Sequence, residues 1–279
     1  MIISEVLKIG GQKLKQKGID NPYNTARILL SNVINVKKEY CISHDSKDIS
    51  IENFEKFNKN VDKIIKGYPL QYITKYQEFM KINFYVDERV LIPQPDTEIL
   101  VEKVIKLCSK YNEKNINILD LCTGSGAIGI SIKKYVENSI VTVSDISKQA
   151  INVARINAKK NNVDIKFVES DLFNKIEKKF DIIVSNPPYI ETNILDKLPK
   201  DVKYEPILAL DGGSDGLKYY RNIVQNAYLF LNDNGYLALE IGYNQKNKVM
   251  DIIKKTEKYK EIIAIKDLSN NDRVIISRI

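Results

Sequence analysis

The residues of this 279-residue chain with the clearest potential for chemistry are Asn186-Pro187-Pro188-Tyr189, which follow the apolar run Phe180–Ser185. The run is rich in β-branched residues and ends before two prolines, which is typical of a buried strand that stops in a rigid turn. Such a turn presents the Asn186 side-chain oxygen and the Pro187 carbonyl as two neutral hydrogen-bond acceptors, which suit a planar NH2 group. The ring of Tyr189 could stack on that plane. A substrate nitrogen held in this way could attack a methyl donor.

A second group with chemical potential is the glycine-rich segment 120–129, which reads DLCTGSGAIG. Gly124 and Gly126 predict a tight turn between a strand and a helix, which lets a ligand approach the backbone closely. The segment lacks the lysine and the Ser/Thr of a phosphate-binding P-loop, so nucleoside triphosphate hydrolysis is disfavoured.

Acidic residues follow the next two predicted strands. Asp145 ends the second strand, where a carboxylate can bind the hydroxyls of a ribose. Asp171 follows the third strand and could accept a hydrogen bond from an adenine amino group. Because the carboxyl ends of parallel strands lie at one edge of a sheet, we expect the two acids, the glycine turn and the Asn186 turn to form one ligand crevice.

The elements that must position these residues alternate between strands and helices from residue 116 onward. This alternation predicts an α/β fold with a doubly wound, mostly parallel sheet of seven strands. The predicted strands are Ile116–Cys122, Ile140–Asp145, Ile165–Ser170, Phe180–Ser185, Tyr236–Ile241, Glu261–Ile265 and Arg273–Ile276. The last two lie too close together for a helical crossover, so the final strand is predicted to be antiparallel.

The chain before the sheet divides into two further parts. Residues 1–68 carry apolar side chains at helical spacing and predict a small helical domain, to which the family resemblance given below assigns substrate recognition. Residues 69–93 look extended and predict a β-hairpin linker, so residues 94–279 would form the main domain. A helix is predicted to begin at Asp96, with Asp96 or Thr97 as its cap.

Composition narrows the classes of function. The net charge of +7 indicates either a basic surface that faces an acidic partner or a lysine-rich background composition. The three cysteines, Cys41, Cys108 and Cys122, are odd in number and far apart, which predicts no disulfide, no metal site and a reducing cytoplasm. No apolar run approaches the roughly 20 residues that a membrane span needs. A single histidine makes histidine acid–base catalysis improbable.

Taken together, these motifs resemble those of the peptide chain release factor glutamine N5-methyltransferases (the HemK/PrmC family), which are class I S-adenosylmethionine-dependent enzymes. The more specific segments are Gly67–Tyr72, Val90–Glu98, Tyr204–Pro206, Leu210–Leu217, Leu239–Gly242 and Asn271–Val274. The resemblance covers essentially the whole chain. Three residues depart from the usual pattern: Gln94 replaces an arginine, Cys122 a glycine and Leu172 an aromatic residue.

The resemblance implies S-adenosylmethionine as cofactor and the glutamine of a Gly-Gly-Gln loop in translation release factors as substrate. The residues implied to bind the cofactor are Cys122, Thr123, Gly124, Ser125, Gly126, Asp145, Asp171, Leu172 and Asn186. Those implied to bind the substrate amide are Asn186, Pro187, Pro188 and Tyr189. Of these, Asn186, Pro187 and Tyr189 would be catalytic.

Two alternatives stay open. A nucleic-acid methyltransferase acting on adenine N6 or guanine N2 would also present a conjugated NH2 group to Asn186 and a base plane to Tyr189. The N-terminal helical region, however, lacks a zinc finger, an aromatic RNA-binding motif and an arginine-rich stretch, so we expect a protein partner rather than a nucleic acid. The other alternative is a non-catalytic cofactor-binding module. We expect a monomer with no membrane partner.

Overall fold

The computed structural model describes residues 1–111 and 115–279, and these form two compact units. The first unit comprises residues 1–75 together with residues 199–204. The second comprises residues 76–198 and 205–279. The division into a helical domain up to residue 68, a hairpin linker and a main domain from residue 94 stays a prediction.

The first unit is helical, as the spacing of its apolar residues predicts. Its helices are α1 (Ile3–Gln16), α2 (Pro22–Val33), α3 (Tyr40–Ser43), α4 (Ile51–Ile65) and α5 (Leu70–Thr74). Ser50 caps α4 by accepting a hydrogen bond from the backbone of Asn53. Gly10 lets α1 approach α4 closely, because a Cβ at this position would lie 2.3 Å from the Phe57 ring.

The second unit contains a short hairpin and a seven-stranded sheet. The hairpin strands are β1 (Gln77–Phe79) and β2 (Ile82–Phe84). The sheet strands are β3 (Ile116–Leu121), β4 (Ser139–Asp145), β5 (Lys166–Glu169), β6 (Phe180–Ser185), β7 (Leu231–Glu240), β8 (Ile262–Lys266) and β9 (Asp272–Arg278). Their order is β5-β4-β3-β6-β7-β9-β8, and only β9 runs antiparallel to its two neighbours. The doubly wound sheet and the antiparallel final strand are thus confirmed.

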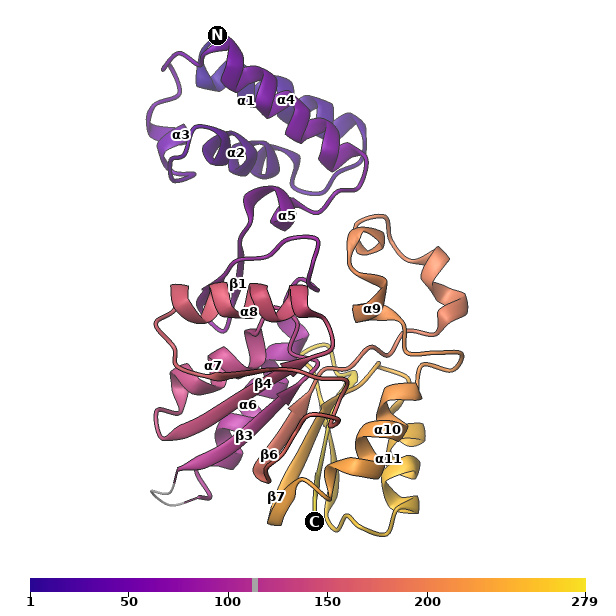
Figure 1. Ribbon diagram of the computed structural model, residues 1–279. Helices are drawn as coiled ribbons and strands as arrows, with labels where there is room; N and C mark the ends of the chain where they lie inside the picture. Colours follow the sequence, from indigo (N-terminus) through magenta and orange to yellow (C-terminus); the bar gives the residue numbers. More distant parts are fainter. Residues whose placement is uncertain (112–114) are drawn as a thin grey trace. The chain divides into compact units, whose positions relative to one another are not determined.

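Helices cover both faces of this sheet (Figure 1). They are α6 (Pro95–Cys108), α7 (Ala127–Tyr135), α8 (Lys148–Lys160), α10 (Lys218–Ala227) and α11 (Lys246–Lys255). The segment between β6 and α10 also contains the short helix α9 (Ile207–Leu210) and 3₁₀ turns at Thr192–Lys197 and Val202–Tyr204. Strand residues alternate between the faces: Ile118 packs in the cluster with α6, α7 and α8, whereas Leu119 packs with α10 and α11. Within the described residues, no helix is both long enough and apolar enough to cross a membrane.

The start of α6 differs from the prediction. The helix begins at Pro95 rather than Asp96, and its N-cap is Gln94, which makes no side-chain cap hydrogen bond. Proline is well suited to the first helical position, because its fixed φ is helical and the amide hydrogen it lacks would have no helical partner there. Thr97 is consequently inside the first turn, where its hydroxyl is available for another contact.

Candidate active site

The carboxyl ends of the central strands border an open cavity of about 750 Å³ in the second unit. Of the predicted site residues, those that line it are Cys122, Gly124, Asp145, Asp171, Leu172, Asn186 and Pro188. Those that lie beside it without lining it are Thr123, Ser125, Gly126, Pro187 and Tyr189. The strand ends thus bring the four motifs together, as a ligand crevice of an open α/β sheet requires.

The turn between β3 and α7 follows a left-handed path at three positions. Cys122, Gly124 and Gly126 have φ angles of 59°, 54° and 82°. This explains why glycine suits the position of Cys122, since only glycine adopts this conformation without strain. A Cβ on Gly124 would meet no atom within 4 Å, whereas one on Gly126 would lie 2.9 Å from Ile130. Gly124 therefore leaves open space beside the cavity, and Gly126 permits close packing.

Asp120 secures this turn from inside the protein. Its Oδ2 accepts hydrogen bonds from the Thr123 hydroxyl (2.5 Å) and the Gly129 amide (3.0 Å). Its side chain is fully buried, and burial raises the pKa of Asp120 to about 7 although both hydrogen bonds favour the ionised form. The sequence places Asp120 in the motif, but its structural role depends on contacts with the first turn of α7.

Asp145 is held rigidly at the end of β4. Its two carboxylate oxygens accept hydrogen bonds from the backbone amides of Gly124 and Ser147, each at 2.9 Å. Burial raises the pKa of Asp145, and the two amides oppose that rise. Each carboxylate oxygen has a second lone pair, so Asp145 can still accept hydrogen bonds from a diol in the cavity.

The other end of the cavity is mainly apolar. Leu172, which has a left-handed φ of 45°, lines it beside the exposed carboxylate of Asp171. Further lining residues that sequence reasoning did not identify are Ile146, Pro206, Leu208, Ala209 and Tyr219. Apolar walls around a few polar groups are typical of a site for a planar heterocycle.

The Asn186 turn lies at the carboxyl end of β6. The Asn186 Nδ2 donates a hydrogen bond to the Thr97 hydroxyl at 3.2 Å. No described residue donates to its Oδ1, and Asn186 lines the cavity. The hydroxyl of half-buried Tyr189 lies 3.5 Å from Oε1 of Glu240, at the long limit of a hydrogen bond. The turn thus offers a neutral acceptor, Oδ1, at the cavity.

Comparison with known proteins agrees with this geometry. A release factor glutamine methyltransferase from Clostridium acetobutylicum is 40% identical to this chain, and the match covers 99% of this chain and 98% of the relative. One from Clostridium botulinum is 39% identical, with coverages of 100% and 99%. This chain belongs to the release factor glutamine methyltransferase family. Two family models also match: the PrmC N-terminal domain over residues 5–74 and the methyltransferase small domain over residues 95–198.

A solved structure supports the fold. The crystal structure of a methyltransferase from Pyrococcus furiosus has a TM-score of 0.54 and 18% identity, and the match covers 79% of this chain and 98% of that one. At this identity the likeness shows the methyltransferase fold alone. Family membership confirms the fold class and the cofactor that the sequence predicts, S-adenosylmethionine.

The release factor methyltransferase family motif at residues 90–98 is anchored to its neighbours by two glutamates. Glu98 accepts a hydrogen bond from the Met80 amide at 2.7 Å and so holds the tip of the hairpin. Buried Glu205 accepts one from the Ile92 amide at 3.1 Å. Both side chains position loops. Gln94, where the family usually has arginine, donates its side-chain amide to the Ile92 carbonyl at 3.0 Å.

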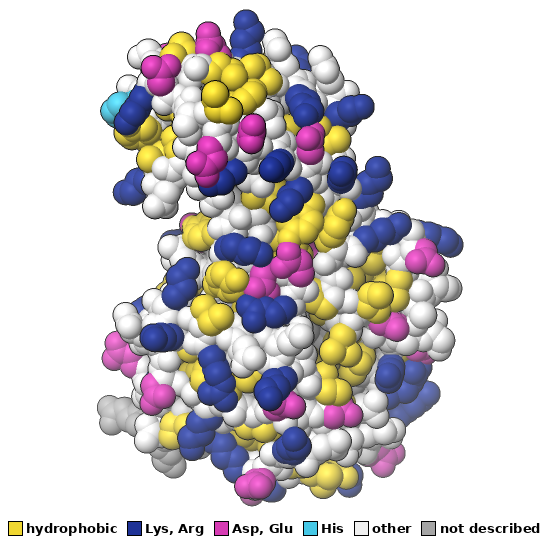
Figure 2. Space-filling model, turned by 45° about the horizontal axis from the view of Figure 1, so that its top comes forward, with side chains coloured by type: hydrophobic (Ala, Val, Ile, Leu, Met, Phe, Trp, Pro, Cys, Tyr) yellow, Lys and Arg dark blue, Asp and Glu magenta, His cyan; other side chains and the backbone are white. Residues whose placement is uncertain are grey.

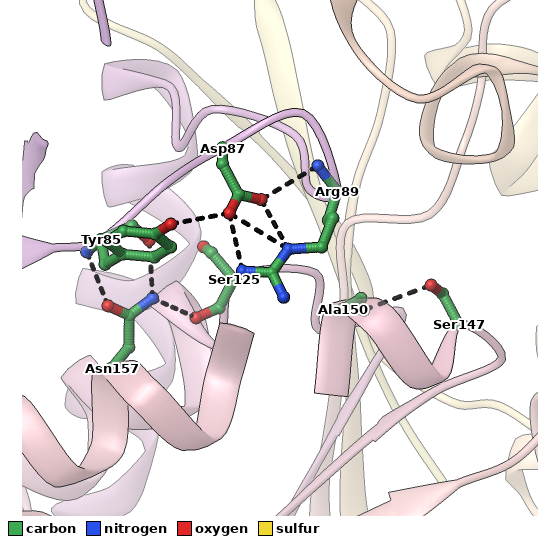
Figure 3. Close-up of polar contacts among 7 residues, drawn as sticks. All are labelled: Tyr85, Asp87, Arg89, Ser125, Ser147, Ala150 and Asn157. Atoms are coloured by element: carbon green, nitrogen blue, oxygen red, sulfur yellow. Dashed lines mark hydrogen bonds and ion pairs between the residues drawn. The ribbon is translucent and has the colours of Figure 1, made fainter. Parts of the chain in front are cut away.

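One charged residue of the cavity was missed by sequence reasoning. Arg89 lines the cavity, and Asp87 holds its guanidinium through both Nε and Nη2 (Figure 3). Burial opposes ionisation of Asp87, but the hydrogen bonds from Arg89 and Tyr85 lower the pKa of Asp87 to about 2. No described residue engages Nη1 of Arg89. The sequence signal was weak, because an arginine in an extended linker has no distinctive spacing.

Asn157 ties this linker to the glycine turn. Its side chain accepts a hydrogen bond from the Tyr85 amide (2.6 Å) and donates to the carbonyls of Tyr85 and Ser125, both at 2.9 Å (Figure 3). Asn157 is fully buried in α8, 72 residues away from Tyr85 in the chain. Nothing in the local sequence distinguishes it from the other asparagines of this asparagine-rich chain.

Proposed function

We propose that this enzyme transfers a methyl group from S-adenosylmethionine to the side-chain amide nitrogen of the glutamine in the Gly-Gly-Gln loop of translation release factors. The observation that carries the proposal is the Asn186 amide, which lines the cavity with a free neutral oxygen. The names of the full-length relatives support the same substrate class.

The residues around the cavity suit the cofactor. Asp145 would bind the ribose hydroxyls, and Asp171 would accept from the adenine amino group between apolar walls that include Leu172. The unengaged Nη1 of Arg89 suits the carboxylate of the methionine portion, since a guanidinium binds carboxylates well. Gly124 leaves room for close approach. In the segment from Cys122 to Gly126, Cys122 and Gly124 would contact the ligand, and Thr123, Ser125 and Gly126 would hold the turn behind them. When bound, the cofactor supplies an electrophilic methyl group.

Asn186 and Pro187 would hold the substrate amide without ionising it. Their oxygens would accept the two amide hydrogens, and Pro188 and Tyr189 would complete the wall of the substrate site. An amide nitrogen is a poor nucleophile because its lone pair is delocalised. Orientation toward the methyl carbon can supply about 7–11 kcal/mol of the barrier. Acceptors that strengthen their bonds as the nitrogen becomes pyramidal would stabilise the transition state further.

The selectivity of such a site follows from the same acceptors. A glutamate carboxylate has no hydrogen to donate to Asn186 or Pro187, so it would leave both oxygens unpaired. A site built for an NH donor can reject such an analogue by roughly 10⁴–10⁵-fold. This accounts for a preference for glutamine over glutamate without any positive charge at the substrate site.

The helical unit is proposed to recognise the body of the release factor. We also propose that the enzyme acts as a monomer. Its three free, widely spaced cysteines support a location in the reducing cytoplasm. Light scattering of the purified protein at assay concentration tests the oligomeric state, and a dimer mass would contradict this part of the proposal.

The decisive experiment incubates the enzyme with methyl-labelled S-adenosylmethionine and purified release factors. A release factor whose Gly-Gly-Gln glutamine is changed to glutamate serves as the matched control. We expect label in the wild-type release factor and none in the control. Label in DNA or ribosomal RNA but not in release factor would favour a nucleic-acid methyltransferase. Cofactor binding without transfer to any acceptor would indicate a non-catalytic module.

A further inference from the structure

A group of buried polar side chains lies behind the Asn186 turn. Thr97, in the first turn of α6, and Glu240, the last residue of β7, are 5% and 2% exposed. The Asn186 amide donates to the Thr97 hydroxyl, and the Tyr189 hydroxyl donates toward Glu240. Two residues of the turn thus contact this buried pair, Asn186 through the Thr97 hydroxyl and Tyr189 through the Glu240 carboxylate.

The hydrogen-bonding capacity of these groups sets a direction. An ionised carboxylate only accepts, and a threonine hydroxyl has one hydrogen to donate and two lone pairs. Oε2 of Glu240 is buried and has no hydrogen-bond partner among the described residues. Burial raises the pKa of Glu240 to about 7, and the nearby Thr97 hydroxyl opposes that rise, so the carboxyl is ionised above about pH 7. If the Thr97 hydrogen points at Glu240, Thr97 can only accept from its other neighbour. That neighbour, Asn186, must then turn its NH2 group inward.

We propose that Thr97 and Glu240 are positioning residues that hold the Asn186 amide one way round, with Nδ2 inward and Oδ1 facing the acceptor nitrogen. This inference rests on the proposed function, because it explains how the site presents an oxygen to a carboxamide. A reversed Asn186 amide would place its NH2 group against the substrate NH2 group, where neither can accept. Orientation of this single side chain therefore separates a productive site from a repulsive one.

Other contacts fix the position of Glu240. The Tyr220 hydroxyl donates to the Glu240 carbonyl at 3.0 Å, which secures the end of β7. The charge of Arg273 opposes the rise that burial causes in the pKa of the Glu240 carboxyl. Arg273 also pairs with Asp96 at 3.0 Å and Asp267 at 3.1 Å. A carboxylate anchored in this way costs little reorganisation when substrate binds.

The test compares Thr97→Val, which removes the hydroxyl at nearly constant volume, with Thr97→Ser, which keeps it. Thr142→Val is the matched control, because Thr142 in β4 is 3% exposed and its hydroxyl has no hydrogen-bond partner among the described residues. The first readout is hydrogen exchange of the Asn186 side-chain NH2, followed by NMR on the full chain and assigned by its loss in Asn186→Ala. The second is kcat and KM with a release factor, together with the Kd of S-adenosylmethionine.

We expect Thr97→Val to speed exchange of the Asn186 NH2 group and to lower kcat by about 100-fold, the typical loss when a reacting group is misplaced by about 1 Å. The KM of the release factor and the Kd of the cofactor should stay nearly constant. Thr97→Ser should restore most of the activity, and Thr142→Val should behave as wild type.

Two results would overturn the proposed role of Thr97. The first is a Thr97→Val variant in which both the exchange rate of the Asn186 NH2 group and kcat equal those of wild type. The second is a Thr97→Ser variant with a kcat as low as that of Thr97→Val. If wild-type enzyme methylates no release factor, the proposed function fails by itself. The exchange measurement needs no substrate, so it still decides whether Thr97 orients Asn186.

Discussion

At the scale of single residues, the site separates two tasks that need different chemistry. Charged side chains, Asp145, Asp171 and Arg89, surround the part of the cavity suited to the cofactor. The proposed substrate rim at Asn186 is uncharged. A carboxylate at the rim would accept the same amide hydrogens, but it would also attract cations and proton donors. A neutral oxygen keeps selectivity for a carboxamide.

Replacement of Asn186 by alanine should remove turnover while sparing the cofactor. We expect a loss of at least about 100-fold in kcat, as when one preorganised hydrogen-bonding group is removed from a transition-state site. Calorimetry should give an S-adenosylmethionine Kd close to that of wild type. Asn222→Ala, at an exposed position in α10, is the control and should be fully active. Full activity of Asn186→Ala would refute the role of this side chain.

Asp145→Asn should weaken cofactor binding because it removes the charge proposed to accept hydrogen bonds from the ribose hydroxyls. Hydrogen bonds to charged groups contribute about 1.5–3 kcal/mol, so the Kd should rise by roughly 10–100-fold. Calorimetry with S-adenosylhomocysteine measures this without turnover. Asp164→Asn, at an exposed loop position, supplies the comparison. Equal affinities of the two variants for S-adenosylhomocysteine would show that Asp145 does not bind the cofactor.

At the scale of elements, loops distant in sequence brace the Asn186 turn. A Cβ on Gly212 would lie 2.7 Å from the Tyr189 Cα, and one on Gly216 would lie 2.5 Å from the Tyr189 carbonyl oxygen. Gln245 donates its side-chain amide to that same oxygen at 3.0 Å. The turn before α10 therefore packs directly against the backbone of the Asn186 turn, which leaves no room for side chains at Gly212 and Gly216.

The Asn157 contact between α8, the linker and the glycine turn should be a large source of stability. Asn157→Ala would leave three backbone groups without partners, two part-buried ones of Tyr85 and a buried one of Ser125, and we expect a loss of about 2–4 kcal/mol in the free energy of unfolding. Urea denaturation measures this loss. Asn161→Ala, at the end of the same helix, breaks more exposed hydrogen bonds and should cost under about 1 kcal/mol. Similar losses in both variants would contradict the argument.

Asp120 should make stability depend on pH. Its folded pKa of about 7 lies above the usual value of 3.8, so the folded state holds its proton more tightly than the unfolded state. The stability linked to this proton is present below about pH 4 and is lost as pH rises toward about 7. Urea denaturation from pH 5 to pH 8 should show this fall in wild type and a shallower fall in Asp120→Asn. If the free energy of unfolding of Asp120→Asn falls with pH as steeply as that of wild type, Asp120 is not the cause of the pH dependence.

At the scale of the whole molecule, charge is the feature that a partner meets first. Lysine and arginine side chains lie over the visible face, interspersed with acidic and apolar ones (Figure 2). The net charge of +7 would attract an acidic protein over about a Debye length, which is near 10 Å in 0.1 M salt.

If this charge serves recognition, the KM of the release factor should rise several-fold between about 0.05 M and about 0.5 M salt, because screening weakens attraction between surfaces. Initial rates at saturating S-adenosylmethionine measure it. The Kd of the cofactor, bound in a partly enclosed cavity, is the internal control and should change less. A KM that does not change with salt would show that the positive charge reflects a lysine-rich composition and does not serve recognition.

Much of the architecture was predictable because it depends on neighbours in the chain. The alternation of Ile118 and Leu119 between two faces follows from strand geometry, and the turn at Gly124 and Gly126 follows from local sterics. The start of α6 was wrong by one residue because the preference of Pro95 for the first helical position outweighed the capping preference of Asp96.

By itself, the sequence determined the order of strands and helices, the glycine turn, the acids that follow the strands and the acceptors of Asn186-Pro187-Pro188-Tyr189, since each depends on short-range backbone constraints. Only the tertiary structure decided that Asn186 donates a hydrogen bond to Thr97, 89 residues earlier in the chain, and that Asn157 accepts one from Tyr85. It also decided that Arg89 lines the cavity. Such pairings arise where separate elements pack, and no local pattern of side chains specifies which polar atoms will then lie within hydrogen-bonding distance.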